Sequence, residues 1–476
     1  MNRIPMIEGL KRYNRLNMAP FSMPGHKKGR AFNNEMMELT LRSDITEVDG
    51  LDNLQNPQGI IKDAQELLKE CYGSQSSYFL INGSTSGNLT MIFAAFQEGD
   101  KVLIERNCHK SIYNGILLRK LKPILLKNEI SEVLNAPLGI DVDHLFEVIE
   151  KEKDIKGIVL TYPNYFGIGV RLEKIVEKCK KSGIKVLIDS AHGAHFGFNE
   201  NLPENPLKYN VDMVVMSAHK TLPALTQTAY LHINKEEYKE KVEFYLRVFN
   251  STSPSYIFMA TLDYSRYYLQ EKAQEEYNLL ISRINNLKKN VGKSPYLKVL
   301  EKEDLGDKWV FDPTKIVITQ QNRYKAEDLL NILYNKGIQC EMSLGRSVVL
   351  IATPFNIQED FDRLEKAVLE IELVEQDSSK DNNSFLNIKD GEIIEPCRIL
   401  QMQTAEADIE KIENMIAAEN IIPYPPGIPF IIMGEKISRQ KKDKLIELVG
   451  TGIDIIGVEC RKIKVVLKDP IKDKDR

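Results

Sequence analysis

Short apolar runs alternate with longer amphipathic stretches between about residue 75 and residue 233. This alternation is typical of a parallel sheet covered by helices. Because the runs are apolar at nearly every position, they predict strands buried on both faces. The predicted strands are 77–81, 101–105, 157–161, 185–189, 212–216 and 228–233. The stretch 171–182 has apolar residues at helical spacing and ends before Gly183, so it predicts one of the covering helices.

The remainder of the chain predicts smaller units. A long, charged helical pattern over 264–290 leads to alternating strand and helix signals. These signals lie at 310–319, 326–336, 348–352 and 358–373. A polar segment then predicts an exposed linker, and a proline-rich stretch, 422–429, lies in the last part of the chain. We therefore expect an N-terminal arm (1–50), a large domain (51–290), a small α+β domain (291–375), a linker (376–385) and a C-terminal domain (386–476).

Composition argues against several classes of protein. The 476 residues carry 64 Lys and Arg against 68 Asp and Glu, so no strong field attracts nucleic acid or an anionic membrane. No apolar run approaches the roughly 18 residues of a spanning helix, and the N-terminus lacks the apolar core of a signal peptide. The six cysteines include no CxxC pair, which indicates neither a disulfide framework nor a zinc ribbon. We expect a cytoplasmic protein.

The first candidate site is the start of a predicted helix. The segment 81–88 (Ile-Asn-Gly-Ser-Thr-Ser-Gly-Asn) follows a predicted strand and opens an apolar helix. Backbone N–H groups at a helix start, with the hydroxyls of Ser84, Thr85 and Ser86 beside them, form a site for phosphate. Capping of the helix by Ser or Thr is the alternative, and the octapeptide alone does not decide between the two.

The second candidate site is Asp189, which ends a predicted buried strand. In an open α/β sheet, ligands bind at this end of the strands. His192 and His195 follow three positions apart. Since no carboxylate or thiol lies at ligand spacing beside them, a metal site is disfavoured.

The third candidate is Lys220, in a Ser-Ala-His-Lys sequence after another predicted strand. A partly desolvated lysine near other cations loses pKa and becomes a nucleophile that forms Schiff bases, although a solvated lysine is the default for an isolated residue. A phosphate-binding helix start, Asp189 and Lys220, in this order, are the three anchors that pyridoxal phosphate (PLP) needs. They hold its phosphate, its ring nitrogen and its aldehyde. This order is that of the aspartate-aminotransferase-like fold.

Longer motifs closely resemble the Orn/Lys/Arg decarboxylase family. They lie, in the family's order, at 20–27, 44–52, 106–111, 189–193, 217–220 and 424–429. The resemblance implies an α/β protein of PLP fold type I, with a mainly parallel seven-stranded sheet in the large domain and smaller α+β C-terminal domains. It also implies the short form of the family, which has no receiver-like N-terminal domain.

The same resemblance implies roles for individual residues. Lys220 would hold the cofactor as an imine, Asp189 would pair with the pyridine nitrogen, and His192 would lie close to the ring and the imine. His109 would stack on the ring, where an isolated histidine of this kind would instead cap a helix or lie satisfied in the core. Lys220 or His219 would donate the proton to Cα, and His219 also matches a phosphate-side position.

The resemblance further implies which residues hold the phosphate. Ser84, Thr85, Ser86 and Ser217 match these positions. Ser253 would reach the phosphate of a neighbouring subunit, since the family is similar to homodimers or assemblies of dimers whose sites lie at the interface. Two residues depart from the family pattern and put details of the cofactor edge in doubt. Asn164 stands where many relatives carry Thr, and Lys28 interrupts what is often His-Lys-Gly-Gly.

The implied activity is PLP-dependent α-decarboxylation of a basic amino acid. We favour L-arginine, giving agmatine and CO2 for polyamine biosynthesis, with lysine and ornithine as alternatives. A carboxylate would recognise the cationic side chain, and the candidates are Asp44, Glu47, Asp49, Asp52 and Glu419. Since the three anchors do not dictate the reaction, an aminotransferase, a catalytically silent PLP-binding protein and a phosphate-binding module remain alternatives.

Overall fold

A computed structural model describes residues 4–320, 326–371, 391–424, 427–450 and 452–467. The predicted linker, 376–385, lies outside the described residues. Within them, no helix is both long enough and apolar enough to cross a membrane.

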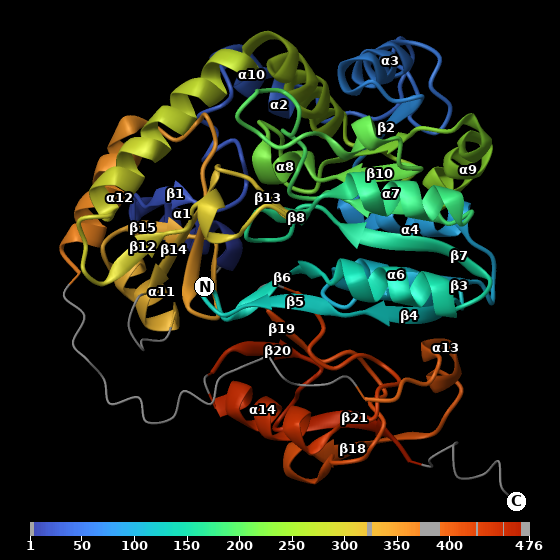
Figure 1. Ribbon diagram of the computed structural model, residues 1–476. Coiled ribbons are helices and arrows are strands. Elements are labelled where there is room, and N and C mark those ends of the chain that lie inside the picture. Colours follow the sequence, from blue (N-terminus) through green and yellow to red (C-terminus); the bar gives the residue numbers. More distant parts are fainter. Residues whose placement is uncertain (1–3, 321–325, 372–390, 425–426, 451, 468–476) are drawn as a thin grey trace, which may run out of the picture.

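A seven-stranded sheet organises the large domain, in the order β2-β11-β10-β9-β7-β3-β4 (Figure 1). Its strands are β2 (Ser76–Leu80), β3 (Lys101–Glu105), β4 (Lys122–Leu126), β7 (Ile155–Thr161), β9 (Lys185–Asp189), β10 (Met213–Met216) and β11 (Ala229–Ile233). All neighbours are parallel except β11, which is antiparallel to β2 and to β10. The mainly parallel, seven-stranded sheet is confirmed, as are all six predicted strands. The additional strand, β4, carries Pro123 and lies at the sheet edge, where the missing N–H is tolerated.

Alternating side chains of the central strands enter two different cores. Leu187 and Val215 pack with residues of α4 and α5, whereas Ile188 and Val214 pack on the opposite face with residues of α7 and α10. This is the two-residue period of a strand buried on both sides. The helices of the large domain are α3 (Ile60–Tyr72), α4 (Gly83–Ala95), α5 (Lys110–Leu118), α6 (Val142–Lys151), α7 (Leu172–Lys181), α8 (Ala218–Thr221), α9 (Lys239–Phe249) and α10 (Tyr256–Val291).

A second, antiparallel sheet of four strands has the order β12-β14-β17-β16. Its strands are β12 (Leu297–Val299), β14 (Lys315–Gln320), β16 (Met342–Leu344) and β17 (Ser347–Ile351), and its helices are α11 (Ala326–Asn335) and α12 (Gln358–Leu369). The predicted continuous strand 310–319 is wrong in one respect. It is two strands, β13 (Trp309–Phe311) and β14, because Pro313 and the bonds from Thr314 to the Asp312 carboxylate make a turn between them.

The N-terminal segment joins this smaller sheet domain. Strand β1 (Ala19–Phe21) pairs in parallel with β15 (Ile338–Cys340). Along the chain, β1 lies between helices α1 (Pro5–Arg15) and α2 (Asn34–Arg42). The short pairs β5 (Asn128–Ser131) with β6 (Ala136–Ile140), and β8 (Ile168–Val170) with β13, complete the two domains.

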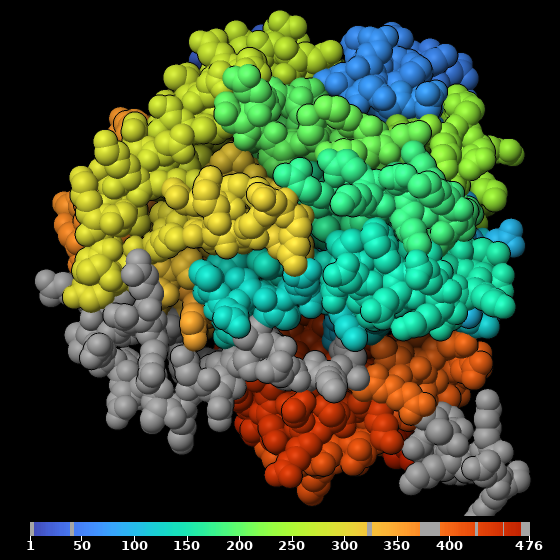
Figure 2. Space-filling view, viewed as in Figure 1, coloured from blue at the N-terminus to red at the C-terminus, as the bar shows by residue number. Residues whose placement is uncertain are grey.

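The C-terminal residues form a third unit with its own apolar core, packed against the large domain (Figure 2). Its elements are α13 (Pro396–Ile399), β18 (Thr404–Asp408), β19 (Ile422–Tyr424), α14 (Arg439–Gly450), β20 (Asp454–Ile456) and β21 (Lys462–Val466). Arg106, which follows β3, donates to the carbonyl oxygens of Pro429 and Phe430 at 2.7 and 2.8 Å. The C-terminal unit therefore holds the loop that leads to His109.

Candidate active site

The predicted phosphate site lies at the start of α4. Asn82 is the N-cap residue, but no side chain caps the helix, so the Ser/Thr capping alternative is wrong here. Ser86 is buried and donates to the Gly83 carbonyl oxygen, while Ser217 donates to the Ser84 hydroxyl at 2.9 Å. The side chain of Thr85 is exposed. The structure thus brings the hydroxyls of Ser84 and Ser217 together beside an uncapped helix start, which suits an anion.

Asp189, at the end of β9, is 2% exposed and held by a chain of hydrogen bonds. Its Oδ2 accepts from Asn88 Nδ2 at 2.8 Å, and its Oδ1 accepts from the Ala191 N–H at 3.1 Å. The other proton of Asn88 Nδ2 goes to Ser111 Oγ at 2.9 Å. Burial raises the pKa of Asp189, and the nearby charge of Lys220 opposes the rise. A cation beside this carboxylate therefore stabilises its charged form.

His109 lies at the other end of this hydrogen-bond chain and caps α5. Its Nδ1 accepts from the Ser111 N–H at 3.2 Å and lies 2.9 Å from Ser111 Oγ. Because the Ser111 hydroxyl accepts from Asn88, its own proton points to His109. Burial lowers the pKa of His109 to about 3, so the ring is neutral, with its proton on Nε2. The helix-capping alternative is therefore realised, and stacking on a cofactor ring stays a prediction.

Lys220 lies in α8, directly after β10. Its Nζ is 3.1 Å from His192 Nε2 and 5.3 Å from the centre of the Tyr165 ring, and the rings of Tyr165 and His192 are 4.6 Å apart. Burial lowers the pKa of Lys220 to about 8, although Asp189 opposes the shift. Burial also holds the pKa of His192 well below its usual value, so its neutral ring can accept a hydrogen bond at Nε2 from the Lys220 amine. The amine of Lys220 is thus far more nucleophilic at neutral pH than that of a solvated lysine.

The position of Lys220 is also fixed by the N-terminal segment. The Gly25 N–H donates to the carbonyl oxygen of His219 at 2.8 Å. A Cβ added at Gly25 would lie 2.5 Å from the carbonyl oxygen of Leu222, so only glycine fits this approach. His219 donates from Nδ1 to the Thr228 carbonyl oxygen at 2.8 Å, and burial lowers the pKa of its ring to about 4.

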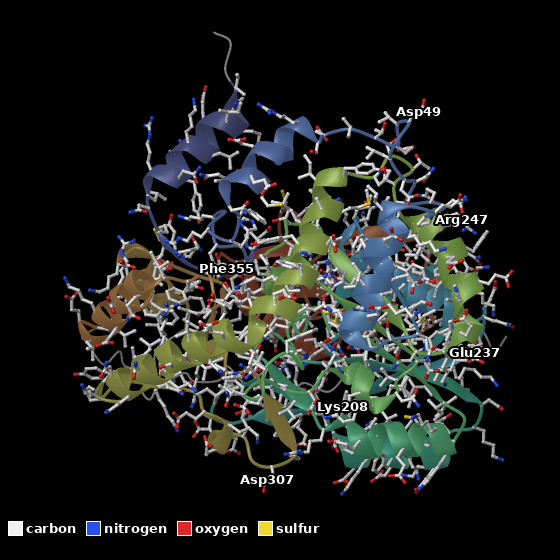
Figure 3. The ribbon with its side chains drawn as sticks, turned by 90° about the horizontal axis from the view of Figure 1, so that it is seen from above. Asp49, Lys208, Glu237, Arg247, Asp307 and Phe355 are labelled. Atoms are coloured by element: carbon white, nitrogen blue, oxygen red, sulfur yellow. The ribbon has the colours of Figure 1, made fainter. Side chains whose placement is uncertain are left out.

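Other predicted residues lie outside this cluster in the single chain. Ser253 is exposed, so its contact with a neighbouring subunit stays a prediction. Asp52 accepts from backbone N–H groups at 58, 59 and 61 and serves the start of α3. Glu419 lies 3.8 Å from Lys464 in the C-terminal unit. Asp44, Glu47 and Asp49 are exposed, and Figure 3 shows Asp49 at the periphery.

The two departures from the family pattern have local structural roles. Asn164 Oδ1 accepts from the N–H groups of Phe166 and Ile168, and its Nδ2 donates to the Leu138 carbonyl oxygen. It therefore shapes the turn that presents Tyr165. Lys28 has a φ of 58°, which is the left-handed region that favours glycine.

Sequence reasoning assigned no role to Asn88, Ser111 or Tyr165. Asn88 gave a weak signal as a polar side chain in an otherwise apolar helix, and its burial at 0% exposure shows that it has partners inside. Ser111 and Tyr165 gave no signal, because their roles depend on which helices and loops lie side by side.

Several buried polar atoms in this region have no partner among the described residues. They are Asn88 Oδ1, Ser190 Oγ and His192 Nδ1. Such atoms are normally satisfied, so they indicate a polar ligand. With the uncapped start of α4, the buried Asp189 and the activated Lys220, these residues fit PLP, which offers a phosphate, a ring nitrogen and an aldehyde.

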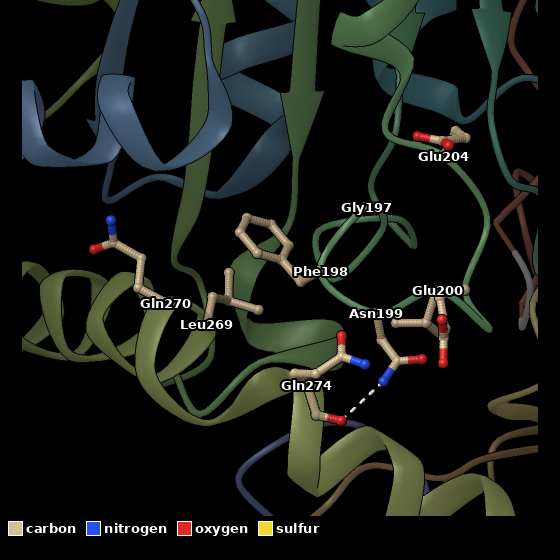
Figure 4. Close-up of a pocket in the computed structure, with 9 residues that line it drawn as sticks. Gly197, Phe198, Asn199, Glu200, Glu204, Leu269, Gln270 and Gln274 are labelled. Atoms are coloured by element: carbon tan, nitrogen blue, oxygen red, sulfur yellow. Dashed lines mark hydrogen bonds between the residues drawn. The ribbon is translucent and has the colours of Figure 1, made fainter.

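A separate surface hollow of about 380 Å³ lies between the loop 197–204 and helix α10 (Figure 4). Phe198, Leu269 and Gln274 are among its lining residues, and Asn199 donates to the Gln274 carbonyl oxygen at 2.9 Å. None of the predicted site residues lines it.

Comparison with known proteins places the chain in a family. The family model described as "Orn/Lys/Arg decarboxylase, major domain" matches residues 4–328, and the one for the C-terminal domain of that family matches 397–449. The chain is 33% identical to uncharacterized protein YaaO of Bacillus subtilis over 95% of this chain and 96% of that one. It is 30% identical to the arginine decarboxylase of the same organism, over 97% of each.

A solved structure shows the fold. The constitutive lysine decarboxylase of E. coli superposes with a TM-score of 0.76 at 18% identity, over 97% of this chain and 82% of that one. The fold is therefore PLP fold type I, as expected. The length and order of the family matches lead to one conclusion: the chain belongs to the Orn/Lys/Arg decarboxylase family.

Proposed function

We propose that the protein is a PLP-dependent decarboxylase that converts L-arginine to agmatine and CO2. The observation that carries the chemistry is the placement of Lys220 against neutral His192, with Asp189 buried near them. Support for arginine comes from relatives about 30% identical over nearly the whole chain that are named arginine decarboxylase. When bound, the cofactor would supply an electron sink for the pair released as CO2 leaves.

The residues of the chain would each have a part in this reaction. The uncapped start of α4, with Ser84 and Ser217, would bind the phosphate. Lys220 would hold the cofactor covalently, and Asp189 would stabilise a positive charge on the ring nitrogen. Asn88 fixes Asp189 by its hydrogen bond, and His109 would cover the ring.

The pKa values favour Lys220 over His219 as the proton donor to Cα. His219 has a pKa of about 4, and its Nδ1–H is held by the Thr228 carbonyl oxygen, so at neutral pH it has no acidic proton to give. Lys220, with a pKa of about 8, is mostly protonated at pH 7 and exchanges its proton readily.

A competition assay tests this proposal. The full-length protein, loaded with PLP, is given equimolar arginine, lysine and ornithine, and the amines formed are identified by mass. We expect agmatine as the dominant product and no product from Lys220→Ala, whereas Lys239→Ala, at an exposed lysine that pairs with Glu236, keeps the parent activity. Cadaverine or putrescine as the main product would contradict the choice of arginine. No amine at all from a protein that binds PLP would contradict decarboxylation.

We also propose that two chains form a homodimer with Ser253 at the partner's phosphate site. Ile45 and Val48, in the segment 44–52, expose 41% and 50% of their surface, and a partner would cover them. Analytical ultracentrifugation should show a dimer that Val48→Asp weakens, and Ser253→Ala should lower the affinity for PLP. A stable monomer that binds PLP with full affinity would contradict this arrangement.

A further inference from the structure

Lys315, the first residue of β14, is a buried lysine whose amine has no hydrogen-bond partner among the described residues. Its side chain is 0% exposed. Asp312 and Glu341 are the carboxylates near enough to favour its charge, but neither is within ion-pair distance. Burial lowers the pKa of Lys315. A charged amine would cost several kcal/mol in this position without a partner, whereas an anionic ligand would offset that cost and keep the amine protonated.

Lys27 makes an informative contrast, because it is an equally buried lysine nearby. Its Nζ donates to the carbonyl oxygens of Ser22 and Ile351, each at 2.8 Å. The fold thus supplies acceptors to Lys27 and none to Lys315. The difference indicates that the partner of Lys315 is not part of the described chain.

The side chain of Lys315 runs beside the loop that carries Tyr165. A Cβ added at Gly167 would lie 2.5 Å from Lys315 Cγ, so this glycine leaves room for the lysine. Tyr165 packs against His192 and lies under Lys220. The charge of Lys315 in turn lowers the pKa of both Lys220 and His192, which shows that the three groups share one region. The unpartnered ammonium is therefore part of the candidate active site.

We propose that Lys315 binds the α-carboxylate of the amino acid substrate. The inference rests on the proposed function and names the group that orients the substrate. A basic amino acid carries a single anionic group, its α-carboxylate, and its cationic side chain would be repelled by Lys315. The phosphate of the cofactor has a separate site at the start of α4, with Ser84 and Ser217.

The proposal predicts a particular kinetic signature. The negative charge that Lys315 contacts disappears as CO2 leaves, so the contact stabilises the bound substrate more than the transition state. Lys315→Met should therefore raise KM and leave kcat unchanged or slightly higher. Loss of a hydrogen bond to a charged group corresponds to an affinity loss of about 10- to 100-fold.

The test compares amino acids with amines that have the same side chain. On the PLP-loaded, full-length protein, the affinity for arginine is measured as KM. The affinities for lysine and ornithine, and for the matching amines agmatine, cadaverine and putrescine, are measured as inhibition constants against arginine turnover. Lys315→Met should weaken binding of the amino acids about 10- to 100-fold and leave binding of the amines within about twofold. The control is Lys185→Met, because this half-buried lysine begins β9, at the end of the strand opposite to Asp189, and donates to the Ala95 carbonyl oxygen.

Other outcomes overturn the proposal. Equal weakening of amino acid and amine, or no weakening, would show that Lys315 does not contact the carboxylate. Lys315→Gln serves as a second variant, and failure of both variants to fold and load PLP would assign the lysine a structural role. If the parent binds lysine or ornithine in place of arginine, the choice of substrate fails while the paired comparison still tests Lys315. If it binds no basic amino acid, the proposed function fails and this inference with it.

Discussion

Replacement of Asn88 tests the hydrogen-bond chain that holds Asp189. In the structure, Asn88 Nδ2 donates to Asp189 Oδ2 at 2.8 Å and to Ser111 Oγ at 2.9 Å, and both bonds are buried. Asn88→Ala removes the two donors without adding a group that competes for the site. The Asp189 carboxylate keeps the bond from the Ala191 N–H, so it loses one of its two protein donors.

The size of the effect follows from the kind of bond that is lost. A hydrogen bond to a charged group contributes about 1.5–3 kcal/mol and a neutral one about 0.5–1.5 kcal/mol. We expect the free energy of unfolding to fall by about 2–4 kcal/mol. Loss of the bond from Asn88, which favours the charged carboxylate, should raise the pKa of Asp189 further above its usual value. The affinity for PLP should fall about 10- to 100-fold, because the carboxylate that would face the ring nitrogen loses a charged hydrogen bond of about 1.5–3 kcal/mol.

The assay is an absorbance titration of PLP into the protein, with stability measured by urea unfolding. Asn199→Ala is the matched control, because Asn199 is 5% exposed and donates to Gln274 and Asn278 beside the surface hollow. It should lose similar stability and keep the parent affinity for PLP. If Asn88→Ala binds PLP as the parent does, or if the control loses as much affinity, the assigned role of Asn88 is refuted.

Three more perturbations follow from the geometry. The rate of covalent PLP capture, followed by stopped-flow absorbance, should rise about tenfold per pH unit up to about pH 8 and then level off, because neutral Lys220 predominates above that pH. A continued rise to pH 10 would contradict the lowered pKa of Lys220. Gly25→Ala should destabilise the fold by about 1–3 kcal/mol and weaken PLP binding, because the added Cβ meets the Leu222 backbone, whereas Gly9→Ala, with open space around it, should not; equal melting temperatures would disprove this. Arg106→Gln should speed amide exchange over residues 427–437, and unchanged exchange by mass spectrometry would show that Arg106 does not hold the C-terminal unit.

The sequence predicted those parts of the site that depend on position along a strand. Asp189 ends β9 and Lys220 follows the neighbouring parallel strand β10, so both lie at the carboxyl ends of the strands, where ligands of open α/β sheets are expected to bind. The long helix was also expected, although it begins at Tyr256, earlier than the pattern indicated.

The contacts between separate elements could not be predicted in this way. The chain from Asp189 through Asn88 to Ser111 requires α4 to pack beside α5, which no local pattern specifies. In the sequence, Lys315 looks like any other residue of a strand. What distinguishes it is that its buried Nζ has no hydrogen-bond partner among the described residues, and no sequence pattern predicts this. For His109 the sequence left two roles open, capping of a helix and stacking on a cofactor ring. Only the structure shows that His109 caps α5.

The contacts of the N-terminal segment have a consequence for biosynthesis. Gly25 bonds to the backbone of His219, and Lys27 bonds to that of Ile351, which lies 324 positions further along the chain. During translation, segment 25–27 is made long before Ile351, so Lys27 gains this anchor only after β17 has left the ribosome. A nascent chain arrested near residue 300 contains Lys220, Asp189 and Gly25 but lacks the anchor at Ile351. Stable seating of the segment beside Lys220 would thus follow synthesis of β17.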